Sequence, residues 1–256
     1  MAGRIAVAFD LDGTLVDLEA FHHDAMLRAA REVGVELTWE EALARLPHFI
    51  GGPDRRLAAE VAALSPAGAA PDKVLAAKQR YFSSLLAAAP RVVPRPGAGE
   101  VLDRLVRRGV PVAVGTVTER DAALGILERA GLLPLVGADR VVTAADVPRL
   151  KPAPDVYLET ARRLGRSPAD QLVFEDSVTG IRAARSAGCP VVAMPTVSDP
   201  EYRRSISAAG VVAVFSTWHD PGLPRLLDRL LAPAERVQVP SVGQPWRPGS
   251  VARADD

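Results

Sequence analysis

The sequence has 256 residues, of which 31 are lysine or arginine and 31 are aspartate or glutamate. This length suits one large domain or a core with a smaller insertion, and a hydrophobic fraction of 48% is ample for a packed core. The balanced charge gives no electrostatic footprint for nucleic acid or an anionic membrane, and no apolar stretch approaches the ~20 residues that span a bilayer. We therefore expect no nucleic acid and no membrane as partners.

The single cysteine, Cys189, rules out an internal disulfide framework. The first apolar run meets Asp10 too soon for a signal peptide. A reducing compartment is the default for such a chain, so we expect a cytoplasmic protein. Because no histidine lies near Cys189 in the sequence, its thiol is expected to be buried and inert.

The chain begins with a short apolar strand that ends at two carboxylates. Residues 5–9 are uniformly apolar, which is typical of a strand buried on both faces of a parallel sheet. Asp10 and Asp12 follow, and in extended geometry residues i and i+2 point to the same side, so both carboxylates could address one centre. A hard divalent cation such as Mg²⁺ would relieve their repulsion. By itself the pair fits an acidic surface turn equally well.

Residues 18–91 are expected to form helices and no strand. Thr38 followed by Glu41 has the pattern of a capping box. The apolar spacing, the proline positions and this cap together predict helices over residues 19–34, 38–46, 53–64 and 71–88.

From Gly97 onward, helices and short apolar strands alternate. Strands are predicted over residues 110–114, 140–143, 171–174, 190–194 and 211–215. Helices are predicted over residues 97–108, 121–131, 154–164, 178–188 and 223–231. This alternation indicates an α/β fold with a parallel sheet covered on both faces. Residues 232–256 are rich in proline, glycine and charge and are expected to form a tail outside the fold.

Three later strand ends carry groups that suit a phosphate. Thr116 offers a hydroxyl, and the main-chain N–H groups of Val117 and of the residue after it lie beside it. Lys151 precedes a proline-rich turn and offers a fixed ammonium. Glu175 and Asp176 end another strand and offer oxygen ligands for a metal.

Each of these groups also has a plainer explanation as a helix cap, a surface lysine or a solvated strand end. Together with the first acidic pair, however, they occur in order at strand ends that a parallel sheet brings to one edge. Coincidence is then a poor account. The residues by themselves predict a metal-assisted phosphate site.

This set of motifs closely resembles the haloacid dehalogenase-like superfamily, in the helical-cap branch that contains β-phosphoglucomutase and phosphoglycolate-type phosphatases. The matching motifs are Phe-Asp-Leu-Asp-Gly-Thr at 9–14, Thr116, Lys-Pro-Ala-Pro-Asp at 151–155 and Phe-Glu-Asp-Ser at 174–177. The resemblance covers about residues 5–231. It implies a Rossmann-like core formed by residues 1–17 and 92–231, an inserted four-helix-bundle cap at 18–91, and a proline-rich tail at 232–256.

The resemblance also implies catalytic roles. Asp10 corresponds to the nucleophile, which forms an aspartyl-phosphate, and Asp12 corresponds to the general acid and base. Mg²⁺ would be held by Asp10, by the main-chain carbonyl of Asp12 and by Asp176. Glu175 is a weaker ligand in this scheme, or a residue behind the ligands.

The expected substrate contacts lie in both parts of the chain. Thr116 and Lys151 would bind the transferring phosphoryl group, with the N–H of Val117 beside them.

In the cap, His22 and the loop around Gly51 could reach the substrate, although His22 fits an ordinary helix face slightly better. Lys78 is either substrate-facing or packed. His23 is expected to face solvent.

Asp12 separates this chain from the true dehalogenases of the superfamily, which lack an aspartate at that position. The basic cap-loop motif typical of β-phosphoglucomutases is not evident at residues 45–51. The expected function is therefore that of a Mg²⁺-dependent phosphatase acting on a small phosphorylated metabolite, as a monomer or homodimer. A phosphomutase is the nearest alternative, and a non-catalytic binding protein of the same fold is a second one.

Overall fold

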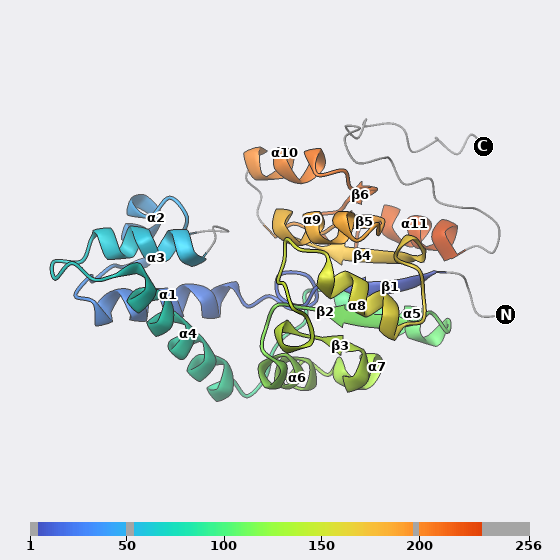
Figure 1. Cartoon of the computed structure of the whole chain (residues 1–256), viewed down its shortest axis with the longest axis horizontal. Helices are drawn as coiled ribbons and strands as arrows, with labels where there is room; N and C mark the ends of the chain where they lie inside the picture. Colours follow the sequence, from blue (N-terminus) through green and yellow to red (C-terminus); the bar gives the residue numbers. More distant parts are fainter. Residues whose placement is uncertain (1–4, 50–53, 197–199, 232–256) are drawn as a thin grey trace. The chain divides into compact units, whose positions relative to one another are not determined.

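The computed structural model describes residues 5–49, 54–196 and 200–231 (Figure 1). The chain divides into two compact units, one formed by residues 18–91 and the other by the segments before and after them. We call them the helical unit and the core unit. The predictions for the loop around Gly51 and for the tail at 232–256 lie outside the described residues.

The core unit contains a six-stranded sheet in which every strand pair is parallel. The spatial order of the strands is β3-β2-β1-β4-β5-β6. The strands are β1 (Ala6–Phe9), β2 (Val112–Gly115), β3 (Val141–Val142), β4 (Gln171–Glu175), β5 (Val191–Ala193) and β6 (Ala213–Val214). The strand order reverses at β1, and in open α/β sheets ligands bind at the carboxyl edge at such a point. The predicted parallel α/β fold is confirmed.

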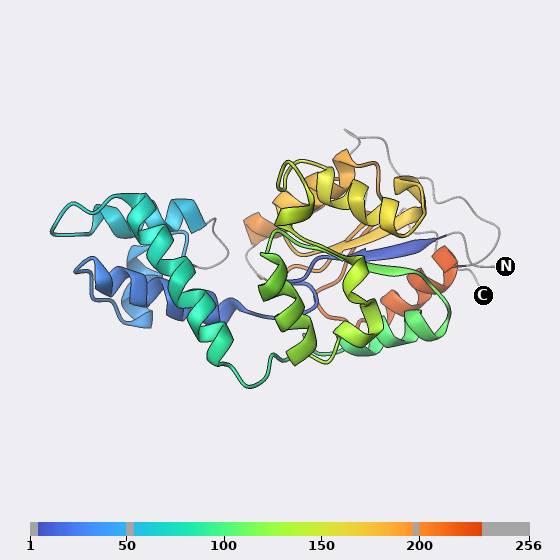
Figure 2. The ribbon, with the colours of Figure 1, turned by 60° about the horizontal axis from the view of Figure 1, so that its bottom comes forward.

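Helices cover both faces of this sheet. Helices α8 and α9 lie on one face, and α5 and α11 lie on the other (Figure 2). The helices of the core unit are α5 (Ala98–Arg107), α6 (Arg120–Arg129), α7 (Leu133–Val136), α8 (Asp155–Arg163), α9 (Val178–Ser186), α10 (Pro200–Ala208) and α11 (Gly222–Leu231). The sequence did not predict α7, which has a single turn, or α10, whose polar sequence shows little apolar periodicity.

Aromatic packing fixes which way the strand ends point. Phe9 and Phe174 are partners in the register of β1 and β4, and their rings stack at 5.2 Å. Trp218 packs against both rings, at 6.0 and 5.0 Å. Side chains alternate across a strand, so the next residues, Asp10 and Glu175, are directed to the opposite face of the sheet.

The helical unit contains four helices in its described residues: α1 (Glu19–Glu32), α2 (Trp39–Arg45), α3 (Asp54–Ala63) and α4 (Pro71–Ala88). The predicted capping box is present: the N–H of Thr38 donates to Glu41 Oε2 at 2.8 Å, and the N–H of Glu41 donates to Thr38 Oγ1 at 3.2 Å. Helix α4 packs against both α1 and α3. The more specific four-helix-bundle arrangement stays a prediction.

The prediction for His23 was wrong. Its side chain is buried, and its ring lies 4.8 Å from the rings of Trp39 and Phe49. Its Nε2 is 3.1 Å from a carboxylate oxygen of Glu19. One ring nitrogen thus keeps a polar partner, while the rest of the imidazole serves as an aromatic core residue.

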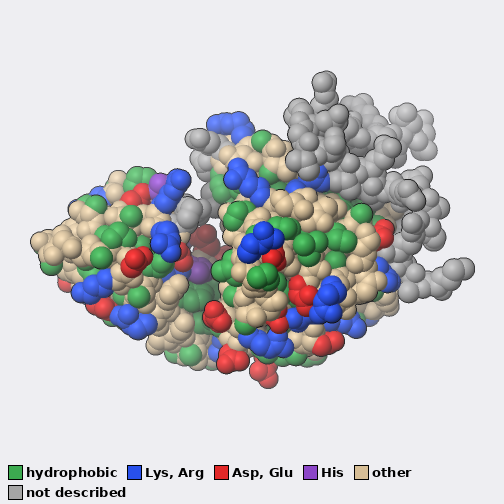
Figure 3. Space-filling view, in the orientation of Figure 1, with side chains coloured by type: hydrophobic (Ala, Val, Ile, Leu, Met, Phe, Trp, Pro, Cys, Tyr) green, Lys and Arg blue, Asp and Glu red, His purple; other side chains and the backbone are tan. Residues whose placement is uncertain are grey.

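Charges of both signs are interspersed on the described face shown in Figure 3. This distribution agrees with the zero formal net charge of the sequence. Within the described residues, no helix has the length and the apolar character needed to cross a membrane.

Candidate active site

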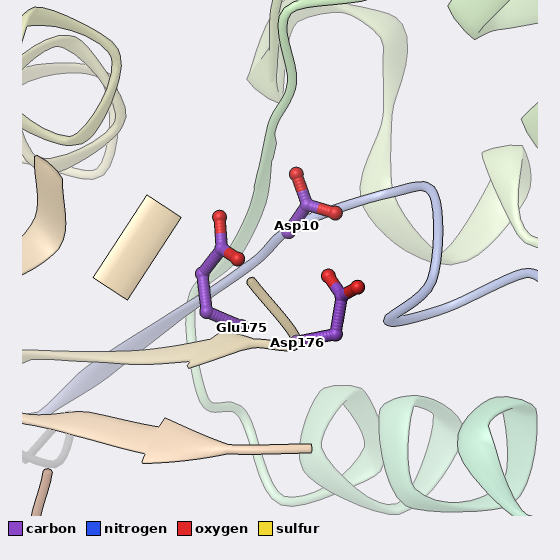
Figure 4. Close-up of side chains that lie close together, drawn as sticks. All are labelled: Asp10, Glu175 and Asp176. Carbon is purple, nitrogen blue, oxygen red and sulfur yellow. The ribbon is translucent and has the colours of Figure 1, made fainter. Parts of the chain in front are cut away.

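Three carboxylates meet at the carboxyl edge of the sheet. Asp10 directly follows β1, Glu175 ends β4, and Asp176 comes next. Each offers an oxygen that lies within 4.8 Å of the oxygens of the other two, and Figure 4 shows the three groups directed toward a shared space. The main-chain N–H of Asp10 donates to the carbonyl of Phe174 at 2.9 Å, so the pairing of β1 with β4 continues up to the site.

The extended conformation ends at Asp10. The N–H groups of Leu15 and Val16 both donate to the carbonyl of Leu11 at 3.0 Å, which closes a tight turn. Asp10 and Asp12 therefore do not continue one strand, and their shared direction cannot be derived from strand alternation as the sequence suggested. Asp12 is nevertheless close enough for its charge to act on Asp10 and Asp176.

A buried lysine, Lys151, contacts two of these carboxylates. Its buried Nζ lies 2.6 Å from Asp10 Oδ1 and 2.6 Å from Glu175 Oε1. It also lies 3.0 Å from the Tyr157 hydroxyl and 3.1 Å from the carbonyl oxygen of Gly115. Burial opposes the charge of Lys151, but the two carboxylates outweigh burial and raise its pKa. The lysine is therefore held as an ammonium.

Glu175 is anchored through both of its oxygens. Oε1 accepts from Lys151 and, at 2.7 Å, from the Tyr157 hydroxyl. Oε2 accepts from the main-chain N–H and the hydroxyl of Ser177, at 3.1 and 3.0 Å. A Cβ at Gly180 would lie 1.6 Å from Oε1, so only glycine leaves room for this carboxylate. Glu175 therefore has less capacity left for a metal than Asp176.

Burial and mutual repulsion make this cluster unfavourable as a set of free anions. Burial, together with the charges of Glu175 and Asp12, raises the pKa of Asp10 to about 7 even though Lys151 lowers it. Burial and the same kind of repulsion raise the pKa of Asp176 well above its usual value. A divalent cation would offset both effects, and an all-oxygen donor set is what Mg²⁺ prefers. The residues present therefore fit a magnesium ion.

Thr116 lies at the end of β2, next to the carbonyl that Lys151 contacts. Its side chain is buried, and its own N–H donates to the carbonyl of Val142 at 2.9 Å. Its Oγ1 accepts from the N–H of Thr118 at 3.1 Å, so that N–H is used within the turn and is not open to a phosphate as the sequence suggested. In contrast to the buried Thr116 side chain, the side chain of the next residue, Val117, is 44% exposed.

The residues singled out in the helical unit form a cluster of their own. Lys78 is buried, and its Nζ lies 2.6 Å from both His22 Nδ1 and Asp54 Oδ2. The ring of His22 stacks on Phe82 at 4.3 Å. His22 is thus bonded within its own unit, and the predicted contact between His22 and substrate stays a prediction.

No role was predicted for Tyr157, Ser177 or Arg95. Tyr157 and Ser177 donate hydrogen bonds to Glu175, and Arg95 donates one to the carbonyl of Gly13 in the turn after β1. For Ser177, the pattern of a serine three residues before Gly180 indicates an N-cap, and its Oγ accepts from the Gly180 N–H at 3.0 Å. For Tyr157, a helix phase counted from Pro154 could have indicated a residue facing the sheet. No local pattern marks Arg95.

Cys189 is buried, as predicted. Burial raises the pKa of its thiol to about 11, although a hydrogen bond from Gln171 and the charge of Arg185 lower it. The thiolate, which is the reactive form, is therefore disfavoured.

A parallel sheet with carboxylates and a buried lysine at its switch point is typical of an α/β protein that binds a ligand there, and its acidic cluster could hold a metal. Residues 6–188 match the family model described as haloacid dehalogenase-like hydrolase. The chain therefore belongs to the haloacid dehalogenase-like hydrolase family, as its motifs predicted.

Individual relatives agree with this assignment. The chain is 34% identical to the plasmid-borne protein CbbY of Cupriavidus necator, over 86% of this chain and 87% of that protein. It is 36% identical to validoxylamine A 7'-phosphate phosphatase of Streptomyces hygroscopicus subsp. limoneus, over 75% and 86%. A solved family hydrolase from Deinococcus radiodurans, with bound phosphate and sodium, superimposes with a TM-score of 0.68 at 30% identity, over 91% of this chain and all of the other. These matches support a phosphoric monoester hydrolase.

Proposed function

We propose that this protein is a Mg²⁺-dependent phosphatase that hydrolyses a small phosphorylated metabolite through an aspartyl-phosphate on Asp10. The observation that carries this proposal is the 2.6 Å contact between Lys151 Nζ and Asp10 Oδ1 at a buried switch point. The ammonium favours the ionised, nucleophilic form of Asp10 and neutralises charge where a phosphoryl group would be bound. A relative named as a phosphatase and a neighbour with bound phosphate support the same reaction class.

The reaction proceeds in two displacements. A carboxylate oxygen of Asp10 attacks phosphorus, and the bond from phosphorus to the ester oxygen breaks as Asp12 gives that oxygen its proton. Water then attacks the phosphorus of the aspartyl-phosphate while Asp12 takes a proton from it. Inorganic phosphate leaves, and Asp10 returns to its carboxylate form. An alcohol and phosphate are thus formed from ester and water.

Asp10, Asp176 and the main-chain carbonyl of Asp12 would hold Mg²⁺, which supplies a positive charge that stabilises the equatorial oxygens of the phosphoryl group. Glu175 supports this set by holding Lys151 in place. Thr116 and the N–H of Val117 contribute further donors for the phosphoryl oxygens.

The test is phosphate release from a panel of phosphorylated metabolites by the full chain, with Mg²⁺ and with a chelator. The proposal expects release that needs Mg²⁺ and disappears in D10N. Borohydride reduction during turnover should convert residue 10 to homoserine, which mass spectrometry detects, because an acyl phosphate is reduced in this way and a free carboxylate is not. Peptide mapping distinguishes a homoserine at residue 10 from one at residue 12, so the same measurement shows which carboxylate was modified.

Three other outcomes would overturn all or part of this proposal. Isomerisation of a sugar phosphate in the presence of a bisphosphate primer, without net phosphate release, would identify a phosphomutase. Release that continues undiminished in D10N would remove the nucleophile from Asp10. Binding of phosphorylated compounds without any turnover would indicate a non-catalytic binding protein.

A further inference from the structure

A buried arginine joins three parts of the core unit at the site. Arg95 lies three residues after the core unit resumes at Val92, and its side chain is buried. Its Nη1 donates to the carbonyl of Gly13 at 2.5 Å and to the carbonyl of Met194, just past β5, at 2.7 Å. Its main-chain N–H donates to the carbonyl of Leu15 at 2.8 Å. Arg95 therefore contacts the turn after β1 with both its backbone and its side chain.

This turn presses directly against a proposed metal ligand. Gly13 has φ of +81°, and a Cβ there would lie 2.3 Å from Asp176 Oδ2. The next residue, Thr14, donates its hydroxyl to Asp176 Oδ1 at 3.1 Å. The position of the Gly13 carbonyl thus sets how the turn meets Asp176. It also sets the orientation of the peptide group between Gly13 and Thr14, which is adjacent to the peptide group that carries the carbonyl of Asp12.

The charge of Arg95 also interacts with the carboxylates of this region. Burial lowers the pKa of Arg95, and the negative charge of Asp176, followed by that of Asp17, raises it. Its hydrogen bonds to Gly13 and Met194 both go to main-chain carbonyls. The guanidinium therefore acts as a fixed clamp on backbone groups beside an acidic cluster.

We propose that Arg95 is a positioning residue for the magnesium site: by holding the carbonyls of Gly13 and Met194, it keeps the turn after β1 in register with Asp176. This inference rests on the proposed function, because it assumes that Mg²⁺ binds at Asp10, Asp12 and Asp176. No motif of the family resemblance contains Arg95. Its effect is exerted through the backbone.

The test compares R95M and R95K with the control R185M in the full chain. Arg185 is 9% exposed, as Arg95 is, and burial likewise lowers its pKa, but it lies in the last turn of α9. Mg²⁺ affinity is measured by calorimetric titration and by the rise in melting temperature on adding Mg²⁺, with circular dichroism as the check of folding. We expect R95M to weaken Mg²⁺ binding by about 10- to 100-fold, as loss of supporting groups behind metal ligands does.

The R95K variant retains a charge but not the planar group that reaches two carbonyls, so it should weaken binding as well, by about 3- to 10-fold. It also decides the matter if R95M does not fold. The R185M variant should bind Mg²⁺ as the wild type does, whatever its stability. Wild-type affinity in both Arg95 variants would overturn the inference while leaving the proposed function intact. An equal loss of Mg²⁺ affinity in R185M would also overturn the inference, because the loss would then be a general effect of removing a buried arginine. A wild type that does not bind Mg²⁺ would overturn the metal site itself.

Discussion

The two units each contain a buried lysine, and the surroundings of the two lysines differ in an instructive way. Lys151 in the core unit lies 4.9 Å from the ring centre of Tyr157, and Lys78 in the helical unit lies 5.1 Å from that of Phe82. Lys151 contacts two carboxylates whose side chains are 10% and 1% exposed. Lys78 contacts one carboxylate, that of Asp54, which is 44% exposed.

We interpret Lys151 as a charge that serves the chemistry of the site and Lys78 as a charge that serves the packing of the helical unit. Around Lys151, the buried carboxylates of Asp10 and Glu175 and the half-buried one of Asp176 outnumber the ammonium and the nearby guanidinium of Arg95. Around Lys78, one ammonium meets one partly solvated carboxylate and a histidine nitrogen. An excess of buried charge of one sign costs folding free energy, and such an arrangement is typical of sites that receive a cation or an ionic substrate.

Replacing Lys151 should produce the largest effect. In K151M the phosphoryl group loses its ammonium partner, and Asp10 loses the group that favours its ionised form. We expect kcat/KM for phosphate release to fall by about a thousandfold, the scale seen when a fixed electrostatic group is removed from an active site. Steady-state kinetics on the best substrate of the panel measure it. A loss of less than about tenfold would contradict the role assigned to Lys151.

The pKa of Asp10 predicts a pH dependence for metal binding. Its pKa in the fold, about 7, is above the ordinary carboxyl value of 3.8. Between these values the folded chain holds a proton that the unfolded chain has lost, so this group makes the metal-free protein less stable as the pH rises from about 4 to about 7. Mg²⁺ competes with the same proton, so its affinity should fall by about tenfold per pH unit below 7.

Melting temperatures with and without Mg²⁺ from pH 5 to 8 measure this effect. The Mg²⁺-induced rise should grow with pH, because the raised pKa values of Asp10 and Asp176 let protons compete with the cation at the lower pH values. The D10N variant lacks the titrating group, so its melting temperature without Mg²⁺ should lose this part of the pH dependence. A wild-type rise that is constant over the whole range would contradict the assignment of Asp10 as a ligand.

Removing the hydroxyl of Tyr157 should have a smaller effect on the same lysine. In Y157F, Glu175 Oε1 loses one of its two donors and Lys151 loses one acceptor, while the ring stays. We expect kcat/KM to fall by about 10- to 100-fold, mostly in kcat, because a hydrogen bond to a charged group contributes about 1.5–3 kcal/mol.

The matched control is T160V, which removes another buried hydroxyl of α8. That hydroxyl donates to the carbonyl of Tyr157 at 3.0 Å. If T160V lowers kcat as much as Y157F does, the effect comes from α8 as a whole and not from the contact with Lys151.

Sequence reasoning succeeded where the chemistry lies within a local motif. Asp10 directly follows one short strand and Glu175 ends another, each recognisable from about five residues, and the parallel sheet brings these strand ends together by topology alone. It could not find Tyr157 or Arg95, because their contacts join segments 18 and 82 residues apart and depend on how α8 and the turn after β1 pack. His23 was misjudged because a helix-surface position becomes a core position when Trp39 packs on it.

The smallest effects are expected in the helical unit, where the exposure of the two partners should decide which variant costs more. The K78M variant leaves Asp54 behind, but that carboxylate is partly solvated and can be hydrated, so the loss in free energy of unfolding should be about 1 kcal/mol. The D54N variant leaves the ammonium of Lys78, whose side chain is 3% exposed, without its counter-charge. Its cost should be greater, about 2 kcal/mol, because water cannot replace the lost partner.

Urea unfolding of the two variants measures this order, and the Mg²⁺-induced rise in melting temperature should be the same in both as in the wild type. If K78M lowers the free energy of unfolding more than D54N does, the packing of the Lys78 side chain contributes more to stability than its ion pair with Asp54 does. If either variant also abolishes the Mg²⁺ effect, the Lys78 cluster acts on the metal site, and the contrast between the two lysines fails. Lys78 and Lys151 both lie 2.6 Å from a carboxylate oxygen, so this distance does not distinguish the two ion pairs. The order of the two costs therefore tests whether the solvation of each partner determines how much a buried ion pair contributes to stability.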